Sequence, residues 1–145
     1  MSVEHITEKN FQDMIKKDGI VLIDFWAEWC GPCRAFGPVF EKAAKENEDI
    51  TFAKCNTEEE QGLAGALGIR SIPTLMIFRD NVLIFNQPGM LPEPVLKDVI
   101  QKVRELDMVE VLKEVEKAEA EAKTEAEHSH EDDEVQPNTS VEGVA

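Results

Sequence analysis

Two cysteines separated by two residues, Cys30 and Cys33, are the side chains of this sequence best suited to chemistry. They stand between an apolar run of strand length, Ile20 to Trp26, and a helical pattern that begins at Cys33. The free amides and the positive dipole end of a helix favour a thiolate, and they lower the pKa of the first cysteine toward neutrality. Because only the thiolate attacks disulfides, the pattern predicts thiol–disulfide exchange, in which an exposed Cys30 attacks and a shielded Cys33 resolves.

Three other roles for this cysteine pair are weaker. A structural disulfide across four residues would constrain the unfolded chain by only about 1.9 kcal/mol. Two inert buried cysteines would not be separated by Gly31 and Pro32, which are typical of a surface turn. Zinc usually needs four ligands, and the remaining candidates are scattered along the chain: His5, Cys55, His128 and His130. We therefore expect exchange chemistry and no metal.

The elements around the pair alternate between helix and strand. Pro38 lies inside the helix that follows the cysteines and predicts a kink there. Thr57 and Glu60 have the spacing of a capping box and predict the start of another helix. The expected elements are helix 7–17, strand 20–26, helix 33–47, strand 50–55, helix 57–68, a hairpin of strands 74–78 and 82–85, and a helix from Glu93. This order predicts an α/β fold with a central mixed β-sheet flanked by helices on both faces.

Charge and aromatic content divide the 145 residues into a domain and an extension. Residues 1–104 carry a net charge of −4, residues 105–145 carry −11, and all nine aromatic residues lie at or before Phe85. We expect a domain over residues 1–106. Asp107 and Glu110 repeat the capping-box spacing, so residues 107–127 are expected to form an acidic helical extension. Residues 128–145 are expected to be a disordered acidic tail.

The acidic extension leaves two interpretations open. It is either a solvating tail without a target, or a docking arm or autoinhibitory strip for a basic partner. A weak metal site at His128 and His130 is a further, less favoured possibility, because a disordered site must bear the entropy of ordering.

The net charge of −15 argues against nucleic acid or an anionic membrane surface as a partner. No run of about 18 apolar residues is present, and residues 1–10 lack the apolar stretch of a signal peptide. We therefore expect a cytoplasmic protein, and we expect it to be a monomer.

Asp24 is a lone carboxylate inside the apolar run 20–26. Burial there should raise its pKa, and Lys54 on the neighbouring strand should offset part of the rise. A raised carboxylate pKa suits proton transfer at Cys33. The leftover thiol, Cys55, should point away from Asp24, because it follows Lys54 in a strand, and we expect it to be buried and inert.

The sequence resembles thioredoxin over residues 5–104. The resemblance extends beyond Trp29-Cys30-Gly31-Pro32-Cys33 to further matching segments: Asp24-Phe25-Trp26, Pro38, Phe52-Ala53-Lys54, the stretch 68–74, and Gly89. It implies the thioredoxin fold and a redox-active disulfide at Cys30 and Cys33, with Cys30 as nucleophile and Cys33 as resolving thiol.

The resemblance also implies roles for the residues around the cysteines. Asp24 would assist Cys33 through water. Pro73 would be in cis and face the two sulfurs, and Ile72 would offer its backbone groups to an extended substrate segment. The flat apolar surface around Cys30 would be formed by Trp29, Gly31, Pro32 and Gly89.

The function that the resemblance implies is reduction of protein disulfides, an oxidoreductase activity that belongs to electron transport and cell redox homeostasis. Electrons would come from NADPH through a flavin-dependent thioredoxin reductase, with no cofactor bound to this chain. Gly31-Pro32 resembles reducing members of the superfamily. The alternatives are a disulfide oxidase or isomerase, and a non-catalytic binding or assembly module that uses the acidic extension.

Overall fold

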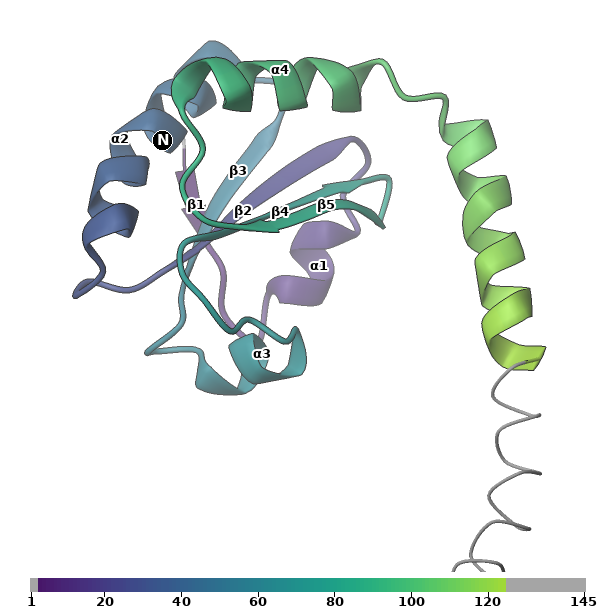
Figure 1. Ribbon diagram of the computed structural model, residues 1–145, viewed down its shortest axis with the longest axis horizontal. Helices are drawn as coiled ribbons and strands as arrows, with labels where there is room; N and C mark the ends of the chain where they lie inside the picture. The colour runs from purple at the N-terminus through teal and green to yellow at the C-terminus, as the bar shows by residue number, and fades with distance from the viewer. Residues whose placement is uncertain (1–2, 125–145) are drawn as a thin grey trace, which may run out of the picture. The chain divides into compact units, whose positions relative to one another are not determined.

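A five-stranded sheet in the order β1-β3-β2-β4-β5 organises the first 105 residues. The computed structural model describes residues 3–124 (Figure 1). The strands are β1 (Val3–His5), β2 (Ile20–Trp26), β3 (Thr51–Asn56), β4 (Thr74–Arg79) and β5 (Val82–Pro88). The first three strands run parallel, and β4 and β5 are antiparallel to their neighbours. The predicted mixed sheet is therefore confirmed.

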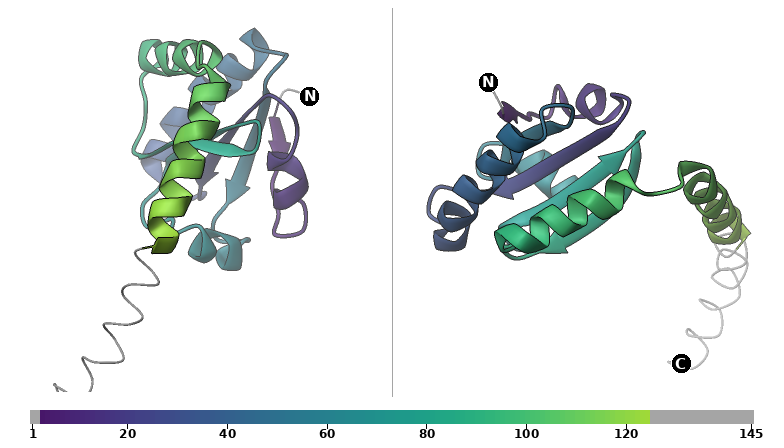
Figure 2. Two further views of the ribbon diagram at one scale, coloured as in Figure 1. Left: turned by 90° about the vertical axis from the view of Figure 1, so that its right-hand side faces the viewer. Right: turned by 90° about the horizontal axis from the view of Figure 1, so that it is seen from above.

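Helices cover both faces of this sheet, as predicted. On one face lie α1 (Phe11–Ile15) and α3 (Gln61–Ala66), and on the other lie α2 (Gly31–Glu46) and α4 (Glu93–Arg104) (Figures 1 and 2). Phe11 meets Phe78 of β4 at a ring distance of 6.1 Å, and Phe40 meets Phe52 of β3 at 5.2 Å on the opposite face. Two separate aromatic contacts thus anchor the two helical layers.

The central strand β2 places Asp24 under α2. Side chains alternate between the two faces of a strand. Ile23 and Phe25 belong to the apolar cluster that includes Phe11 of α1, so Leu22 and Asp24 point to the other face. Six of the seven residues of β2 are buried, as expected for a strand covered on both sides.

One strand was missed, and the start of one helix was misplaced. The edge strand β1 was missed, because its three residues are partly or fully exposed and show no apolar alternation. Thr57 does not cap α3: its hydroxyl donates to the carbonyl oxygen of Trp26, and α3 begins only at Gln61. The side-chain oxygen of Asn56 instead accepts from the amides of Glu58 and Glu59. Asn56 therefore stabilises the turn before α3, whereas α3 itself begins after Glu60 without a side-chain cap.

The helix α1 is also shorter than expected, because the hydroxyl of Thr7 accepts from the amide of Asn10 in a turn that precedes Phe11. The strand β5, in contrast, extends beyond Phe85 to Pro88. Its longer pairing with β4 sets Pro88 opposite Thr74. The following residue, Gly89, is thereby placed beside Pro73.

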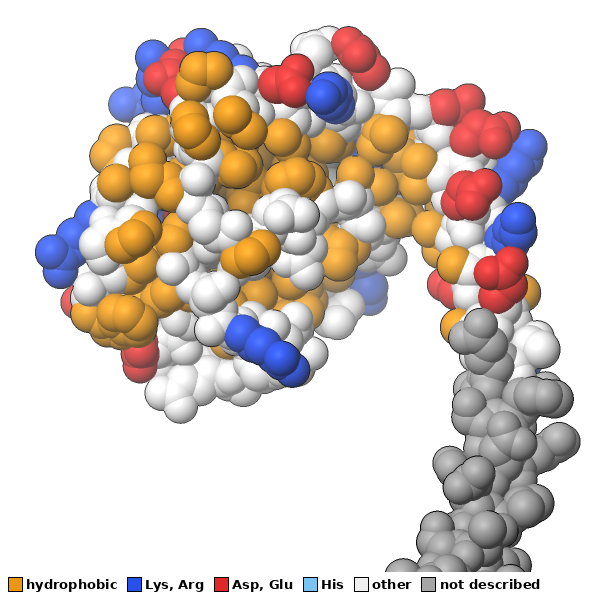
Figure 3. Space-filling model, viewed as in Figure 1, with side chains coloured by type: hydrophobic (Ala, Val, Ile, Leu, Met, Phe, Trp, Pro, Cys, Tyr) orange, Lys and Arg blue, Asp and Glu red, His pale blue; other side chains and the backbone are white. Residues whose placement is uncertain are grey.

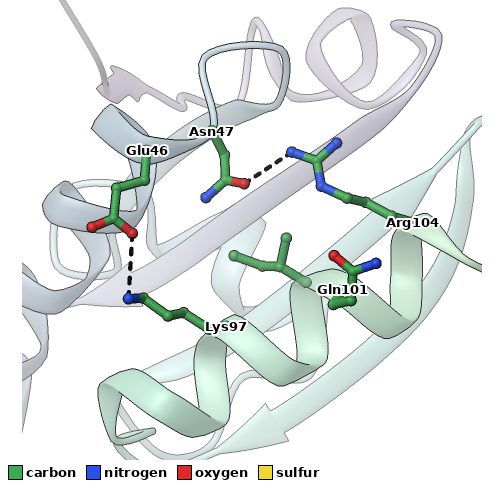
Figure 4. Close-up of a pocket in the computed structure, with 6 residues that line it drawn as sticks. Glu46, Asn47, Lys97, Gln101 and Arg104 are labelled. Atoms are coloured by element: carbon green, nitrogen blue, oxygen red, sulfur yellow. Dashed lines mark hydrogen bonds and ion pairs between the residues drawn. The ribbon is translucent and has the colours of Figure 1, made fainter.

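Ion pairs connect the carboxyl-terminal half of α2 with the amino-terminal half of α4: Lys42 pairs with Glu93 at 2.8 Å, and Glu46 pairs with Lys97 at 3.7 Å. The second pair borders a cleft of about 280 Å³ lined by Glu46, Asn47, Lys97, Ile100, Gln101 and Arg104 (Figure 4). Arg104 makes the strongest set of contacts: its guanidinium donates to both carboxylate oxygens of Asp49, at 2.6 and 2.9 Å, and to the side-chain oxygen of Asn47 at 2.9 Å. Such a two-pronged contact fixes geometry better than a single ion pair.

Residues from Leu106 onward form a second unit. Within the described residues this unit holds a helix over 108–124, whose first turn donates to the carboxylate of Asp107 from the amides of Val109 and Glu110. The predicted continuation over 125–127 and the predicted disorder of 128–145 lie outside the described residues.

Replacing Arg104 by alanine should lower the free energy of unfolding of the domain by about 1 kcal/mol, because α4 loses its two-pronged link to Asp49. Chemical denaturation measures this change. Lys102→Ala serves as the matched control, because Lys102 makes only an exposed pair with Asp98 at 3.0 Å. Its expected effect is below about 0.5 kcal/mol. Equal losses in the two variants would contradict the assignment.

Candidate active site

The two cysteines lie where β2 has ended and α2 begins, as the sequence predicted. Cys30 is the N-cap residue of α2, and Cys33 lies in its first turn. The two are joined as a disulfide with Cα atoms 5.2 Å apart. Pro32 suits the first turn of a helix, where a missing amide leaves no hydrogen bond unmade.

The sulfur of Cys30 occupies the position of a capping acceptor. The backbone amide of Cys33 donates to Cys30 Sγ at 3.1 Å. In the reduced protein the same amide, together with the positive end of the helix, stabilises negative charge on this sulfur. The geometry therefore favours a thiolate at Cys30.

Exposure does not distinguish the two cysteines in the disulfide form. Cys30 is 4 % exposed and Cys33 is 5 % exposed, so the expectation of an exposed Cys30 and a shielded Cys33 is not met here. Their positions differ instead: one caps the helix and the other lies within it.

The loop before β4 brings two further predicted residues to the disulfide. The bond between Ile72 and Pro73 is cis, as the resemblance implied. The carbonyl oxygen of Ile72 lies 3.7 Å from Cys30 Sγ, and the amide of Gly89 donates to the carbonyl of Pro73 at 2.7 Å. Residues from three distant parts of the sequence thus meet beside the sulfur of Cys30.

Trp29 is the most exposed large apolar side chain of the described residues, at 66 %. Figure 3 shows apolar side chains over much of the face of the first unit that is in view. The indole of Trp29 is held by a residue that the sequence analysis missed: its Nε1 donates to Glu58 Oε1 at 2.8 Å. Arg34, also missed, donates to the carbonyl of Glu28 at 2.9 Å. No sequence pattern indicates the first contact, because it joins segments 29 residues apart, and the second joins residues six apart around the start of α2.

Asp24 is fully buried, and neither of its carboxylate oxygens has a hydrogen-bond partner among the described residues. Burial raises the pKa of its carboxyl group from 3.8 to about 7, and the positive charge of Lys54 offsets part of that rise. Both effects match the expectation from the sequence.

Lys54 lies opposite Asp24 in the pairing of β2 with β3. Its ammonium stands 4.7 Å from the ring centre of Trp26, and a Cβ atom on Gly37 of α2 would lie 3.9 Å from it. Lys54 also lines a cleft of about 450 Å³, together with His5, Ile6, Thr7, Trp26, Glu28, Asn56, Glu59 and Glu60. This cation therefore lies between the buried carboxyl group and a cleft at the carboxyl ends of β2 and β3.

Cys55 lies on the opposite face of the sheet from Asp24, in the apolar cluster with Phe25 and Phe11. It is completely buried, and burial raises the pKa of its thiol to about 12. The predicted burial is therefore confirmed, and that this thiol is inert stays a prediction.

Among residues 3–124, no group of three or more His, Cys, Asp or Glu side chains is arranged to hold a metal ion. The possible ligands His128 and His130 lie outside the described residues. In the same part of the chain, no helix has the length and apolar character needed to cross a bilayer.

A helix-capping cysteine, a second cysteine one turn later and a cis-proline loop on a mixed sheet define a dithiol–disulfide exchange protein. The family model for thioredoxin matches residues 2–102. The chain therefore belongs to the thioredoxin family, whose members need no bound cofactor for this exchange. It is a thiol–disulfide oxidoreductase of the thioredoxin type, and its activity is that of a protein-disulfide reductase.

Similar proteins agree with this assignment. The chain is 54 % identical over 121 residues to the "Putative thioredoxin 2" of Streptomyces coelicolor, covering 83 % of this chain and 90 % of that protein. It is 43 % identical over 104 residues to the thioredoxin of Porphyra purpurea, covering 70 % and 97 %. Among solved structures, a single-residue mutant of a thioredoxin from Halobacterium salinarum superposes with a TM-score of 0.67 at 36 % identity, covering 72 % and 93 %.

Because its pKa is raised, the buried carboxyl group of Asp24 makes the free energy of unfolding depend on pH. Unfolded Asp24 loses its proton near pH 3.8, whereas the folded protein retains it up to about pH 7. Below the lower value both states are protonated, so the stabilising protonated form is fully present in acid. Stability falls as the pH rises from 4 to 7, by on the order of 4 kcal/mol at about 1.4 kcal/mol per pH unit.

Asp24→Asn should therefore remove most of the decline in the free energy of unfolding between pH 4.5 and 8.5. Guanidinium unfolding of the oxidised proteins at several pH values measures it. Glu59→Gln, which removes an exposed carboxylate, should retain the slope of the unmodified protein. If the free energy of unfolding of Asp24→Asn declined with pH as steeply as that of the unmodified protein, the Asp24 carboxyl group would have the same pKa in the folded and unfolded states. That result would contradict the prediction.

Proposed function

We propose that this protein reduces disulfides of cytoplasmic protein substrates through a dithiol–disulfide cycle at Cys30 and Cys33. The observation that carries the proposal is the hydrogen bond from the amide of Cys33 to Cys30 Sγ at the start of α2. An N–H group aimed at a sulfur stabilises the thiolate needed for attack. The partners are the substrate proteins and a reductase, and the protein acts as a monomer.

The exchange proceeds in two steps. The Cys30 thiolate attacks one sulfur of the substrate disulfide, and the other substrate sulfur leaves as a thiolate and takes up a proton. The Cys33 thiol then loses its proton and attacks Cys30 Sγ in the mixed disulfide. The second substrate thiol is released, and two electrons have passed to the substrate as the Cys30–Cys33 disulfide forms.

The surface around Cys30 would bind the substrate chain. Ile72 offers backbone groups beside the sulfur, since its carbonyl lies 3.7 Å from Cys30 Sγ. An extended substrate segment would pair with these groups in the manner of an added strand. The apolar contacts would come from four residues around the sulfur: Trp29, Gly31, Pro32 and Gly89. Pro73 would keep this loop in place through the hydrogen bond that its carbonyl accepts from Gly89.

Asp24 would assist proton transfer at the Cys33 thiol through water. Its two unpartnered oxygens under α2 support this role, because a buried carboxyl group with a pKa of about 7 exchanges protons readily near neutral pH. Lys54 would adjust the pKa of Asp24 and connect it with the cleft at the ends of β2 and β3.

The electrons would come from NADPH through a flavin-dependent thioredoxin reductase, with no cofactor resident on this chain. A measured reduction potential tests the direction of the reaction, because about 30 mV corresponds to roughly 1.4 kcal/mol. A potential well above that of the glutathione pool would favour an oxidase or isomerase instead.

Cys30→Ser should abolish reduction of insulin by the reduced protein, because the attacking sulfur is lost. Cys33→Ser should still attack but accumulate a covalent mixed disulfide, since no second thiol resolves it. Non-reducing electrophoresis with mass spectrometry detects the adduct, and Cys55→Ala, which leaves no polar group in the apolar cluster, serves as the matched control with full turnover. An adduct that survives in Cys30→Ser would contradict the assignment of the nucleophile.

Deleting residues 107–145 should leave the reduction rates of model disulfides unchanged, because every residue proposed for the site lies at or before Gly89. The rates are compared for several protein disulfides of different surface charge. Equal rates on all of them agree with a solvating extension. A selective loss on basic substrates would identify the extension as a docking arm.

A further inference from the structure

The indole of Trp29 is exposed to solvent and yet held in one orientation. Its Nε1 donates to Glu58 Oε1 at 2.8 Å, across 29 positions of sequence. An exposed aromatic side chain normally samples several rotamers. A hydrogen bond to an ionised carboxylate is roughly twice as strong as one between neutral groups, so it selects the rotamer that can reach Glu58.

Glu58, which accepts the hydrogen bond from the indole, is held in place by hydrogen bonds within its own loop. The amide of Glu58 donates to the side chain of Asn56 at 2.9 Å, and its carbonyl accepts from the side chain of Gln61 at 3.2 Å. The amide of Thr57 donates to the carbonyl of Trp26 at 2.9 Å. The carboxylate is therefore presented from a loop tied to the end of the same strand that leads into Trp29.

We propose that Glu58 is a positioning residue of the exchange site: its carboxylate holds the indole of Trp29 as a preformed contact surface beside Cys30. The inference rests on the proposed function of this surface in binding protein disulfides. A preformed surface loses less side-chain entropy when a substrate binds. Glu58 thus raises the affinity for protein disulfides and leaves the attack of the Cys30 thiolate on a small disulfide unaffected.

Stopped-flow single-turnover reactions of the reduced protein separate these two effects. Glu58→Ala should raise the apparent Kd for insulin by about threefold to tenfold, without changing the limiting rate or the rate with 5,5′-dithiobis(2-nitrobenzoic acid). Glu58→Gln keeps an acceptor oxygen and should recover much of the affinity. Glu59→Ala removes a neighbouring exposed carboxylate and should match the unmodified protein, which separates the hydrogen bond from the change in charge.

A double-mutant cycle tests whether Glu58 acts through the indole. Trp29→Phe removes the N–H donor and keeps an aromatic ring, so adding Glu58→Ala to it should have no further effect on the affinity for insulin. Nuclear magnetic resonance supplies an independent readout, because the two tryptophans give only two indole N–H signals. Glu58→Ala should lower the order parameter of the Trp29 signal and leave that of Trp26 unchanged.

The inference is overturned if Glu58→Ala and Glu59→Ala weaken insulin binding equally, if Glu58→Ala still weakens it in the Trp29→Phe background, or if the Trp29 order parameter stays the same. An unmodified protein that reduces neither insulin nor the small disulfide would contradict the proposed function instead. The two failures are therefore distinguishable.

Discussion

The sulfur of Cys30 caps the first turn of α2, where it accepts a hydrogen bond from the amide of Cys33 at 3.1 Å. This contact makes a sulfur the capping group of a helix. A helix leaves its first amides unpaired, and a thiolate satisfies one of them while its charge gains from the helix dipole. The chemistry of the pair and the start of the helix are therefore the same interaction, and the layers of the fold serve to keep it in place.

The carboxyl group buried under α2 lowers the stability of the folded domain. Asp24 lies on the central strand with two unpartnered oxygens, and burial moves the pKa of its carboxyl group to about 7. A folded domain without a use for this proton would be more stable with an apolar residue at the position. The positive charge of the Lys54 ammonium offsets part of the cost of burying the Asp24 carboxyl group. The same ammonium lies over the ring of Trp26, 4.7 Å from its centre. Proton transfer near neutral pH is the benefit that such a group brings to a thiol site.

The surface around the sulfur is built from segments that the sheet brings together. The loop between β2 and α2 supplies Trp29, the loop before β4 supplies Ile72 and Pro73, and the residue after β5 is Gly89. The β3–α3 loop adds Glu58, which bonds to the indole rather than to the disulfide. The groups that contact Cys30 Sγ through hydrogen bonds are backbone groups, the amide of Cys33 and the carbonyl of Ile72. In the proposed function, backbone groups would pair with an extended substrate chain of varied sequence.

Three features could be predicted from the sequence: the mixed sheet with helices on both faces, the cysteine pair between strand and helix, and the burial of Asp24 and Cys55 on opposite faces. These features follow from periodicity and from the local chemistry of one segment. Three other features became visible only in the folded protein: Val3–His5 joins the sheet edge, Asn56 rather than Thr57 accepts from the amides of the turn before α3, and both cysteines are equally buried as a disulfide. The hydrogen bond between Trp29 and Glu58 became visible there as well. The pairing of Val3–His5 with β3, the hydrogen bond from Thr57 to Trp26, and the bond between Trp29 and Glu58 each join segments far apart in sequence, so local periodicity cannot indicate them.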